Sequence, residues 1–462
     1  MSTPRHLRRA RHAQSFSFGG VLRSLTAISC ICYILATPAR DVYSSVITQP
    51  APQILTQTSA DTPVSLAPLL SWMLEADAIS YEIEFFSDAM TNLNPQEVDK
   101  RAIFRTREVY TNEINLPLDT IRIDLPASQP LWWRVRALGV DGEPISPFSL
   151  LAPLYTNPDL PRMNAPLLRP IPKSGKGSAL LYPVYSWVRL CGAVGFEVAL
   201  YDANPEEQPD LAPIALEPSP IAELYDANPR MGDVTYYWRV RSFDRKGAPL
   251  GTWSETASFR TEARHWDIAV LGDSISHGGG RLSYGPENLE YSWLSYLDFA
   301  AINLSQSGNI TRDMVERFER DVLPFSPTYL LIMGGTNDLR SDEFTLEEAI
   351  ANMEALKDKC REYGIKPIFL TLPPIHPANI ERAFDEPTIP DWQERFAAFN
   401  DYLRQQPHID TAAAFAPYAT NGELPEWLGL DGLHEDVIGK QLIAARINAK
   451  WEEARTIADE WE

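Results

Sequence analysis

The sequence predicts a multidomain protein in which two β-sandwich modules precede one α/β domain with a mostly parallel sheet. The chain has 462 residues, and about 150 residues per domain suggests roughly three domains. Paired motifs occur twice before residue 264, which indicates an internal repeat. After residue 264, apolar runs alternate with helical patterns. The expected boundaries are 1–39 for an N-terminal segment, 48–156 and 157–263 for the sandwiches, and 264–462 for the α/β domain.

The first 39 residues differ from the rest in containing five arginines and no acidic residue. An uncharged stretch follows Arg23 and leads to Thr37-Pro38-Ala39, an order typical of an export signal with a cleavage site. Only 16 residues separate Arg23 from Arg40, whereas a membrane anchor needs about 20 apolar residues. We therefore expect a cleaved signal and an exported protein, whether periplasmic, cell-surface or secreted. An uncleaved anchor, attaching the chain to the membrane only through this segment, is the alternative.

Charge and cysteine usage exclude several kinds of partner and site. The net charge of -21 repels phosphate backbones and anionic membranes, so we expect no nucleic-acid partner. Cys30 and Cys32 lie in the predicted signal, and Cys191 and Cys360 lie in different predicted domains, so no disulfide framework is expected. Ala27 stands where a lipid-attachment box usually has Leu, which makes Cys30 a poor lipidation site. No phosphate-binding glycine loop or metal-ligand motif is present, so we expect no cofactor and no metal.

The repeat before residue 264 predicts two similar β-sandwiches. Its matched motifs are Leu70–Trp72 and Tyr185–Trp187, Tyr81–Glu84 and Phe196–Val198, and Trp132–Arg136 and Tyr237–Arg241. Both copies have short alternating strands separated by Pro, Gly and Asp turns. The pair resembles fibronectin type III modules, which carry a tryptophan on the second strand and an aromatic-rich strand near the end. The tryptophans expected in the two cores are Trp72, Trp133, Trp187 and Trp238.

The last 200 residues have the pattern of alternating strands and helices. Three apolar runs predict buried parallel strands: Ile268–Leu271, Tyr329–Met333 and Ile368–Leu372. Between the second and third runs, apolar residues recur at helical spacing, with Thr345 and Glu348 as a capping box and Gly364 as the stop. A last helix is expected after residue 434, with an apolar face made by Ile438, Leu442 and Ala445.

Four short motifs in this region occur in an order that fits one reaction centre. They are Gly272–Ser274, Ser307–Gly308, Gly334–Asp338 and Asp431–His434. Each of the first three follows an apolar strand, and ligands bind at the carboxyl ends of strands in open α/β sheets. The fourth precedes the last helix. We therefore expect all four motifs to meet at one edge of the sheet.

The residue types in these motifs suit acyl transfer by a serine. A serine hydroxyl needs a neighbouring base, and we expect Ser274 as nucleophile with His434 as base. Asp431 is expected to hold the tautomer and orientation of that imidazole. The negative oxygen of the tetrahedral intermediate needs donors already in place, for which we expect the backbone at Ser274 and Gly308 and the amide of Asn337.

Together the ordered motifs resemble the four signature blocks of the SGNH hydrolases, also called GDSL esterases and lipases. The resemblance covers only residues from about 264 onward. It implies a flavodoxin-like three-layer αβα fold, no metal, and hydrolysis of small ester groups from lipids, sugars or thioesters. Two positions depart from the family pattern: Ser305 stands where Gly is frequent, and Glu435 follows the histidine where Pro is common.

Other readings stay open at this point. Each motif alone is also common as a turn or helix cap. His277 is a rival base that would more naturally line the pocket, and His376 could reach the substrate from the next loop. The leading hypothesis is an exported serine esterase that removes small acyl groups, such as acetyl, from a small-molecule or glycan ester. The alternatives are an acyltransferase using the same site and a non-catalytic surface protein on a hydrolase scaffold.

Overall fold

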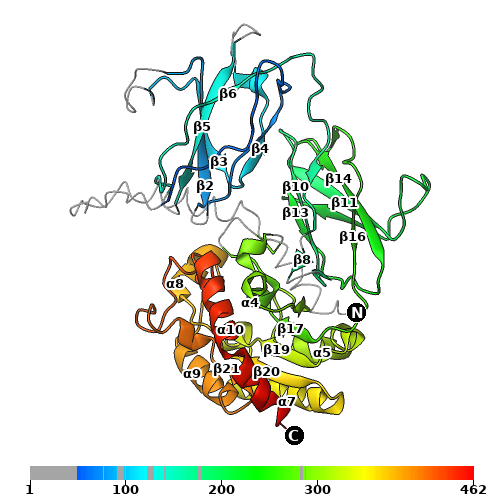
Figure 1. Ribbon diagram of the computed structural model, residues 1–462, viewed down its shortest axis with the longest axis vertical. Coiled ribbons are helices and arrows are strands. Elements are labelled where there is room, and N and C mark those ends of the chain that lie inside the picture. The colour runs from blue at the N-terminus through cyan, green and yellow to red at the C-terminus, as the bar shows by residue number, and fades with distance from the viewer. Residues whose placement is uncertain are drawn as a thin grey trace, which may run out of the picture.

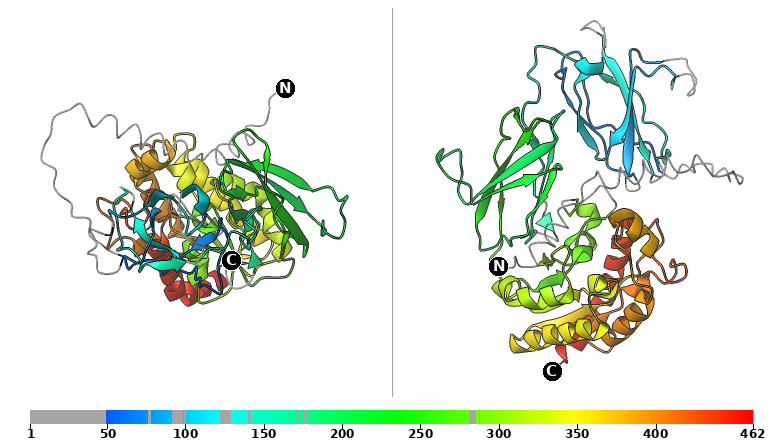
Figure 2. Two further views of the ribbon diagram at one scale, coloured as in Figure 1. Left: turned by 90° about the horizontal axis from the view of Figure 1, so that it is seen from above. Right: turned by 180° about the vertical axis from the view of Figure 1, so that it is seen from behind.

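The chain forms two antiparallel sheet units and one parallel α/β unit in this computed structural model (Figure 1). The structure describes residues 49–461 except 76–77, 91–97, 99, 122–128, 140–141, 172, 175–177, 281–284 and 287. The predicted export signal, residues 1–39, lies outside the described residues. Within the described part, no helix combines the length and apolar character needed to cross a membrane. Both sheet units lie on one side of the α/β unit (Figure 2).

The first sheet unit consists of two packed antiparallel sheets. Strands β3 (Phe104–Val109), β2 (Ser80–Phe86), β5 (Leu131–Leu138) and β6 (Ala152–Leu154) form one sheet, and β1 (Leu69–Ser71) pairs with β4 (Glu113–Asn115) in the other. A short 3-10 helix, η1 (Leu118–Ile121), follows β4. Trp72 and Trp133 are fully buried between the sheets, and the Trp72 ring meets Tyr81 edge-on at 5.1 Å. The core positions expected for these two tryptophans are confirmed.

The second sheet unit repeats this arrangement. One sheet contains β12 (Ala215–Ser219), β11 (Gly195–Tyr201), β14 (Thr235–Phe243), β15 (Pro249–Leu250) and β16 (Ala257–Arg260). The other contains β13 (Glu223–Tyr225), β10 (Val184–Val188) and β7 (Leu167–Leu168), and β8 (Lys173–Ser174) and β9 (Ser178–Ala179) form a separate small hairpin. Trp187 and Trp238 lie in its core as expected. Resemblance of the two units to fibronectin type III modules stays a prediction.

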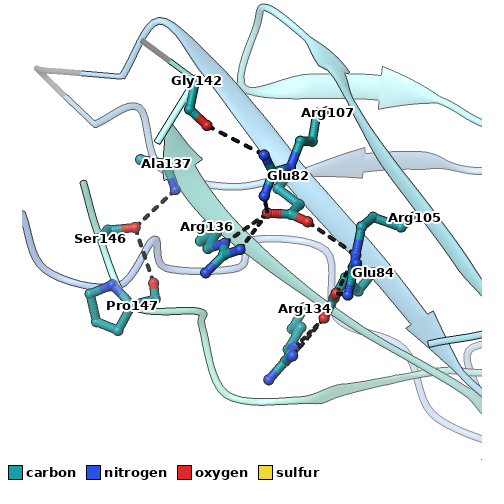
Figure 3. Close-up of polar contacts among 10 residues, drawn as sticks. All are labelled: Glu82, Glu84, Arg105, Arg107, Arg134, Arg136, Ala137, Gly142, Ser146 and Pro147. Atoms are coloured by element: carbon teal, nitrogen blue, oxygen red, sulfur yellow. Dashed lines mark hydrogen bonds and ion pairs between the residues drawn. The ribbon is translucent and has the colours of Figure 1, made fainter. Parts of the chain in front are cut away.

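The repeated Arg-Val-Arg motif pairs with glutamates on the outer face of each sheet. In the first unit, Glu82 lies opposite Arg136, and Glu84 opposite Arg134, across β2 and β5 (Figure 3). Each arginine places two nitrogens within 2.8 Å of its glutamate. Both guanidinium groups also stack on Phe148, at 3.8 and 4.2 Å. The glutamates have no exposed side-chain surface, and buried carboxylates need such partners.

The second unit repeats this side-chain pattern at the same spacing. Arg239 and Arg241 of β14 stack on Trp253, which follows Arg239 by the same 14 residues that separate Phe148 from Arg134. Glu197 of β11 pairs with Arg241 at 2.6 Å. The internal repeat seen in the sequence therefore extends to individual contacts, because Glu197 faces Arg241 as Glu82 faces Arg136. The second glutamate is not repeated, since Ala199 stands opposite Arg239 where Glu84 stands opposite Arg134.

The α/β unit is built on a five-stranded parallel sheet with strand order β18-β17-β19-β20-β21. The strands are β17 (Ile268–Gly272), β18 (Ile302–Asn303), β19 (Tyr329–Met333), β20 (Lys366–Leu370) and β21 (His408–Ile409). The predicted third strand starts and ends two residues early, because Leu372 leaves the ladder and its backbone N–H donates to the Asn400 side chain. The predicted α/β class and parallel sheet are confirmed.

Helices cover both faces of this sheet, so the unit has three layers. One face carries α5 (Thr311–Asp321), α7 (Leu346–Glu362) and α9 (Trp392–Leu403), and the other carries α10 (Val437–Asp459) with η3 (Trp293–Tyr296). Shorter helices are α4 (Ser274–His277), η2 (Leu289–Tyr291), η4 (Leu323–Phe325), α6 (Thr336–Leu339), α8 (Pro377–Phe384) and η5 (Ala412–Ala414). The short helix α4 lies on the side of the α/β unit that faces the two sheet units (Figures 1 and 2).

Two helix predictions had opposite outcomes. The capping box that starts α7 is confirmed, since Thr345 Oγ1 accepts from the Glu348 N–H at 3.1 Å and the Glu348 carboxylate accepts in return. The predicted apolar face of α10 is wrong at two of its three residues: Ile438 and Ala445 are exposed, whereas Leu442 packs against the core. The buried face instead contains Lys440 together with residues such as Ile443 and Ile447. Because a lysine is buried in this face, the spacing of apolar residues alone does not locate it.

Candidate active site

The nucleophile candidate stands where strand β17 ends and α4 begins. Asp273 caps this turn, because its carboxylate Oδ1 accepts from the Ile275 N–H at 3.0 Å. A side chain at Gly272 would place its Cβ 2.6 Å from the Met333 carbonyl oxygen of neighbouring β19, so only glycine allows the two strands to pack here. Ser274 is half-buried at the start of the helix, where its hydroxyl and backbone N–H are presented at the sheet edge.

The three residues expected to act together in acyl transfer form one hydrogen-bonded chain. His434 Nε2 lies 2.8 Å from Ser274 Oγ, and His434 Nδ1 lies 2.8 Å from Asp431 Oδ2. A carboxylate only accepts, so the Nδ1 proton points to Asp431 and leaves the Nε2 lone pair for the Ser274 hydroxyl. The second oxygen of Asp431 accepts from the N–H groups of Leu433 and His434, which fixes the carboxylate within its own loop.

The two expected oxyanion donors follow β18 and β19, the two strands that flank β17 in the sheet. We call residues 305–309, which follow β18, the oxyanion loop. Gly308 in this loop is exposed, has a left-handed φ of 81°, and would meet nothing within 4 Å of an added Cβ. Asn337 at the start of α6 donates one amide hydrogen to the Asn309 carbonyl at 2.9 Å, which orients its side chain and leaves the second amide hydrogen free to donate.

Arg317 of α5 lies buried beneath these strand ends and connects them. Its guanidinium donates to the carbonyls of Gly272 at 3.0 Å and Leu304 at 2.6 Å, and to the Asn309 side chain at 2.6 Å. It also pairs with Asp321 at 3.0 Å. This role could not be predicted from the sequence, because Arg317 lies in an amphipathic helix, where an arginine would ordinarily face solvent.

The structure buries His277 instead of placing it as a rival base or in the lining of the pocket, the two positions that the sequence suggested. Its ring is 1% exposed, with Nδ1 2.7 Å from Ser307 Oγ and Nε2 2.8 Å from the Tyr182 carbonyl oxygen. Burial lowers the pKa of His277 to about 4, so the ring is neutral near pH 7. A carbonyl only accepts, so Nε2 carries the proton and Nδ1 accepts from the Ser307 hydroxyl. Both nitrogens are therefore engaged by the protein, and neither is turned to a substrate.

His376, the N-cap residue of α8, contacts the loop that carries Asp431 and His434. Its backbone N–H donates to the Gly432 carbonyl at 2.7 Å, and its Nδ1 accepts from the Asn379 N–H at 3.2 Å as the cap of α8. Its Nε2 lies 3.6 Å from a Glu423 carboxylate oxygen. A Cβ at Gly432 would lie 2.4 Å from the His376 carbonyl oxygen, so the two loops are packed in direct contact. Substrate contact by His376 stays a prediction.

Comparison with known proteins places the four motifs inside one family match. Residues 270–442 match the model of the GDSL-like Lipase/Acylhydrolase family. YqeF, an uncharacterized lipoprotein of Bacillus subtilis, is 31% identical over 124 residues, which cover 24% of this chain and 51% of YqeF. The chain thus spans about half the length of this curated relative.

Two solved enzyme structures are similar to part of the chain. Axe2, an acetylxylan esterase from Geobacillus stearothermophilus, is 21% identical to this chain. The match covers 40% of this chain and 92% of the Axe2 chain, with a TM-score of 0.32. A lipase/acylhydrolase from Enterococcus faecalis is 24% identical and covers 43% of this chain and 98% of its own, with a TM-score of 0.31.

Proposed function

We propose that the GDSL-like lipase/acylhydrolase domain at residues 270–442 makes this chain a serine ester hydrolase. The observation that carries the proposal is the chain from Ser274 Oγ through His434 to Asp431, with 2.8 Å at both links. This hydrogen-bonded chain supports the proposal, because it joins a hydroxyl, an imidazole and a carboxylate from motifs 160 residues apart, and nucleophilic catalysis by serine uses these three groups.

The proposed reaction has two half-reactions. Ser274 Oγ attacks the acyl carbon while His434 Nε2 takes its proton, and Asp431 stabilises the imidazolium that forms. The carbonyl oxygen becomes negative and accepts hydrogen bonds from the Ser274 and Gly308 N–H groups and from the Asn337 amide. His434 then gives its proton to the departing alcohol as the ester C–O bond breaks. Water then attacks the acyl carbon of the acyl-enzyme while the same imidazole takes its proton. The bond from this carbon to Ser274 Oγ breaks, His434 returns the proton to Ser274, and the acid leaves.

The proposed substrate is a small acyl ester, such as an acetyl ester, carried by a carbohydrate outside the cytoplasm. The arginine-rich start followed by an uncharged stretch supports export, and the net charge of -21 disfavours nucleic acid and anionic lipid surfaces. The two sheet units that precede the hydrolase domain lie on the side of that domain that carries α4, where Ser274 is located (Figure 1). This placement favours a large substrate, such as a polysaccharide, that contacts the sheet units as well as the site.

A turnover screen tests this proposal. Purified protein is assayed with acetyl, butyryl and octanoyl esters of one chromogenic alcohol and with acetylated polysaccharide, alongside Ser274→Ala. We expect the acetyl ester and the polysaccharide to be cleaved and Ser274→Ala to be inactive. Acyl transfer to an added sugar in preference to water would identify a transferase instead. An inert wild type that an active-site fluorophosphonate also fails to label would show a non-catalytic protein.

A further inference from the structure

We propose that the second sheet unit is part of the catalytic apparatus, because its Tyr182 positions the oxyanion loop through both His277 and Arg317. This inference rests on the proposed function and adds positioning residues outside the family match. Tyr182 lies between β9 and β10 of the sheet unit, yet Leu181 and Tyr182 are buried in the hydrophobic core of the α/β unit. The two units therefore share a core at this point.

The first connection runs through the backbone of Tyr182. Its carbonyl accepts from His277 Nε2 at 2.8 Å, and His277 Nδ1 accepts from the Ser307 hydroxyl at 2.7 Å. The ring of Tyr225, also from the sheet unit, packs edge-on against His277 with 5.4 Å between ring centroids. His277 is thus held by the sheet unit on one side and holds Ser307 on the other.

The second connection runs through the phenol of Tyr182. Its hydroxyl donates to the Asp321 carboxylate and accepts from Arg320 at 2.6 Å. Asp321 pairs with Arg317, whose guanidinium holds the Asn309 side chain at 2.6 Å. Tyr182 and Asp321 have no exposed surface, so these bonds are shielded from water.

The two connections end on either side of Gly308. The expected donor there is a backbone N–H, whose direction is set by the residues before and after it. Gly308 itself is exposed and has no Cβ to pack, so its neighbours must hold it. Ser307 is held through His277, and Asn309 through Arg317. Both neighbours therefore depend on Tyr182, and a small displacement of an oxyanion donor lowers the rate strongly.

The test compares Tyr182→Phe and His277→Phe with a matched control, Tyr185→Phe. Tyr185 donates to Asp226 at 3.0 Å inside the sheet unit, so its variant also loses a buried phenol–carboxylate bond, and this bond does not involve His277, Arg317 or residues 305–309. Amide hydrogen exchange is measured on the peptide spanning residues 305–309, and kcat and KM are measured with an acetyl ester. The exchange measurement does not need turnover.

We expect faster exchange in residues 305–309 for Tyr182→Phe and His277→Phe, and an unchanged rate for Tyr185→Phe. We expect kcat to fall about tenfold or more in the first two variants with little change in KM, because transition-state donors are affected. Adding Ser307→Ala to His277→Phe should cost little further, since both remove the same connection.

The inference is overturned if exchange and kcat in Tyr182→Phe equal those of Tyr185→Phe. If His277→Phe fails to fold, Tyr182→Phe still decides whether the phenol holds the loop through Arg317, because it removes one hydroxyl and keeps the ring and the backbone carbonyl that His277 contacts. An inert wild type would instead contradict the proposed function, while the exchange rates would still show whether Tyr182 holds the loop.

Discussion

Glu435 and Lys440 form an ion pair at 3.2 Å in which neither side chain has any exposed surface. Lys440 Nζ also donates to the Ile275 carbonyl at 2.9 Å, so one ammonium group joins the nucleophile turn to the residue after His434. The sequence pattern had marked Glu435 as a departure from the related family, where proline is common. The ion pair explains this departure, because the glutamate balances a buried lysine that holds α4 in place.

Breaking this pair should cost more stability than removing it. Lys440→Met leaves the Glu435 carboxylate buried without a cation, which we expect to lower the free energy of unfolding by about 3–5 kcal/mol. Adding Glu435→Gln removes the unpaired charge and should restore much of that loss. Urea unfolding measures both. A double variant that is as unstable as Lys440→Met alone would show that the pair does not act as a unit.

Gly308→Ala should lower activity much more than stability. Its backbone has a left-handed φ but open space around an added Cβ, so we expect a loss of about 1 kcal/mol in the free energy of unfolding. Gly364 after α7 has φ of 68° and the same open space, which makes Gly364→Ala a matched control. Both variants should unfold alike in urea, but only Gly308→Ala should lose kcat. If kcat were equal in the two variants, the prediction that the substrate oxygen approaches the backbone at Gly308 would be wrong.

Asn337→Ala should lower kcat by about 10²–10³-fold with little effect on KM, because the amide is needed only when the oxygen becomes negative. The side chain is half-buried and its recorded bond is to the Asn309 carbonyl, so the fold should tolerate its loss. Steady-state kinetics with an acetyl ester measure the effect. A rise in KM with kcat unchanged would assign Asn337 to substrate binding instead.

Asp273 should make the protein less stable as the pH rises. Burial raises the pKa of Asp273 from its ordinary 3.8 to about 7. Between these values the unfolded chain has released this proton while the folded chain keeps it, so the free energy of unfolding falls, by at most about 1.4 kcal/mol per pH unit. Asp273→Asn keeps the cap to Ile275 and cannot ionise. Urea unfolding from pH 4 to 7 should show a smaller decline for this variant, and parallel curves would refute the prediction.

The sequence predicted the parts of the structure that depend on local patterns. The capping box at Thr345, the buried tryptophans and the strand ends that carry Ser274 and Asn337 follow from periodicity and short motifs. The same patterns brought Ser274, Asp431 and His434 to one edge, because parallel strands share the end at which their loops lie.

What the sequence could not predict depends on partners distant along the chain. The burial of Lys440 is one example, since only the fold shows Glu435 and the Ile275 carbonyl beside it. His277 was expected to line the pocket, because its buried position depends on Tyr182, which lies 95 residues earlier and carries no motif. Helical periodicity likewise cannot show that Arg317 has buried carbonyls to donate to.

The central claim is that His434 activates Ser274, and the rate of fluorophosphonate labelling tests it most directly. Intact-mass and peptide analysis should show one adduct on Ser274 in the wild type and none in Ser274→Ala. We expect the labelling rate of His434→Ala to be lower than that of the wild type by a factor of about 10³ or more, while its urea unfolding curve stays unchanged. Labelling of His434→Ala at the wild-type rate, or an adduct on a different residue, would contradict the account.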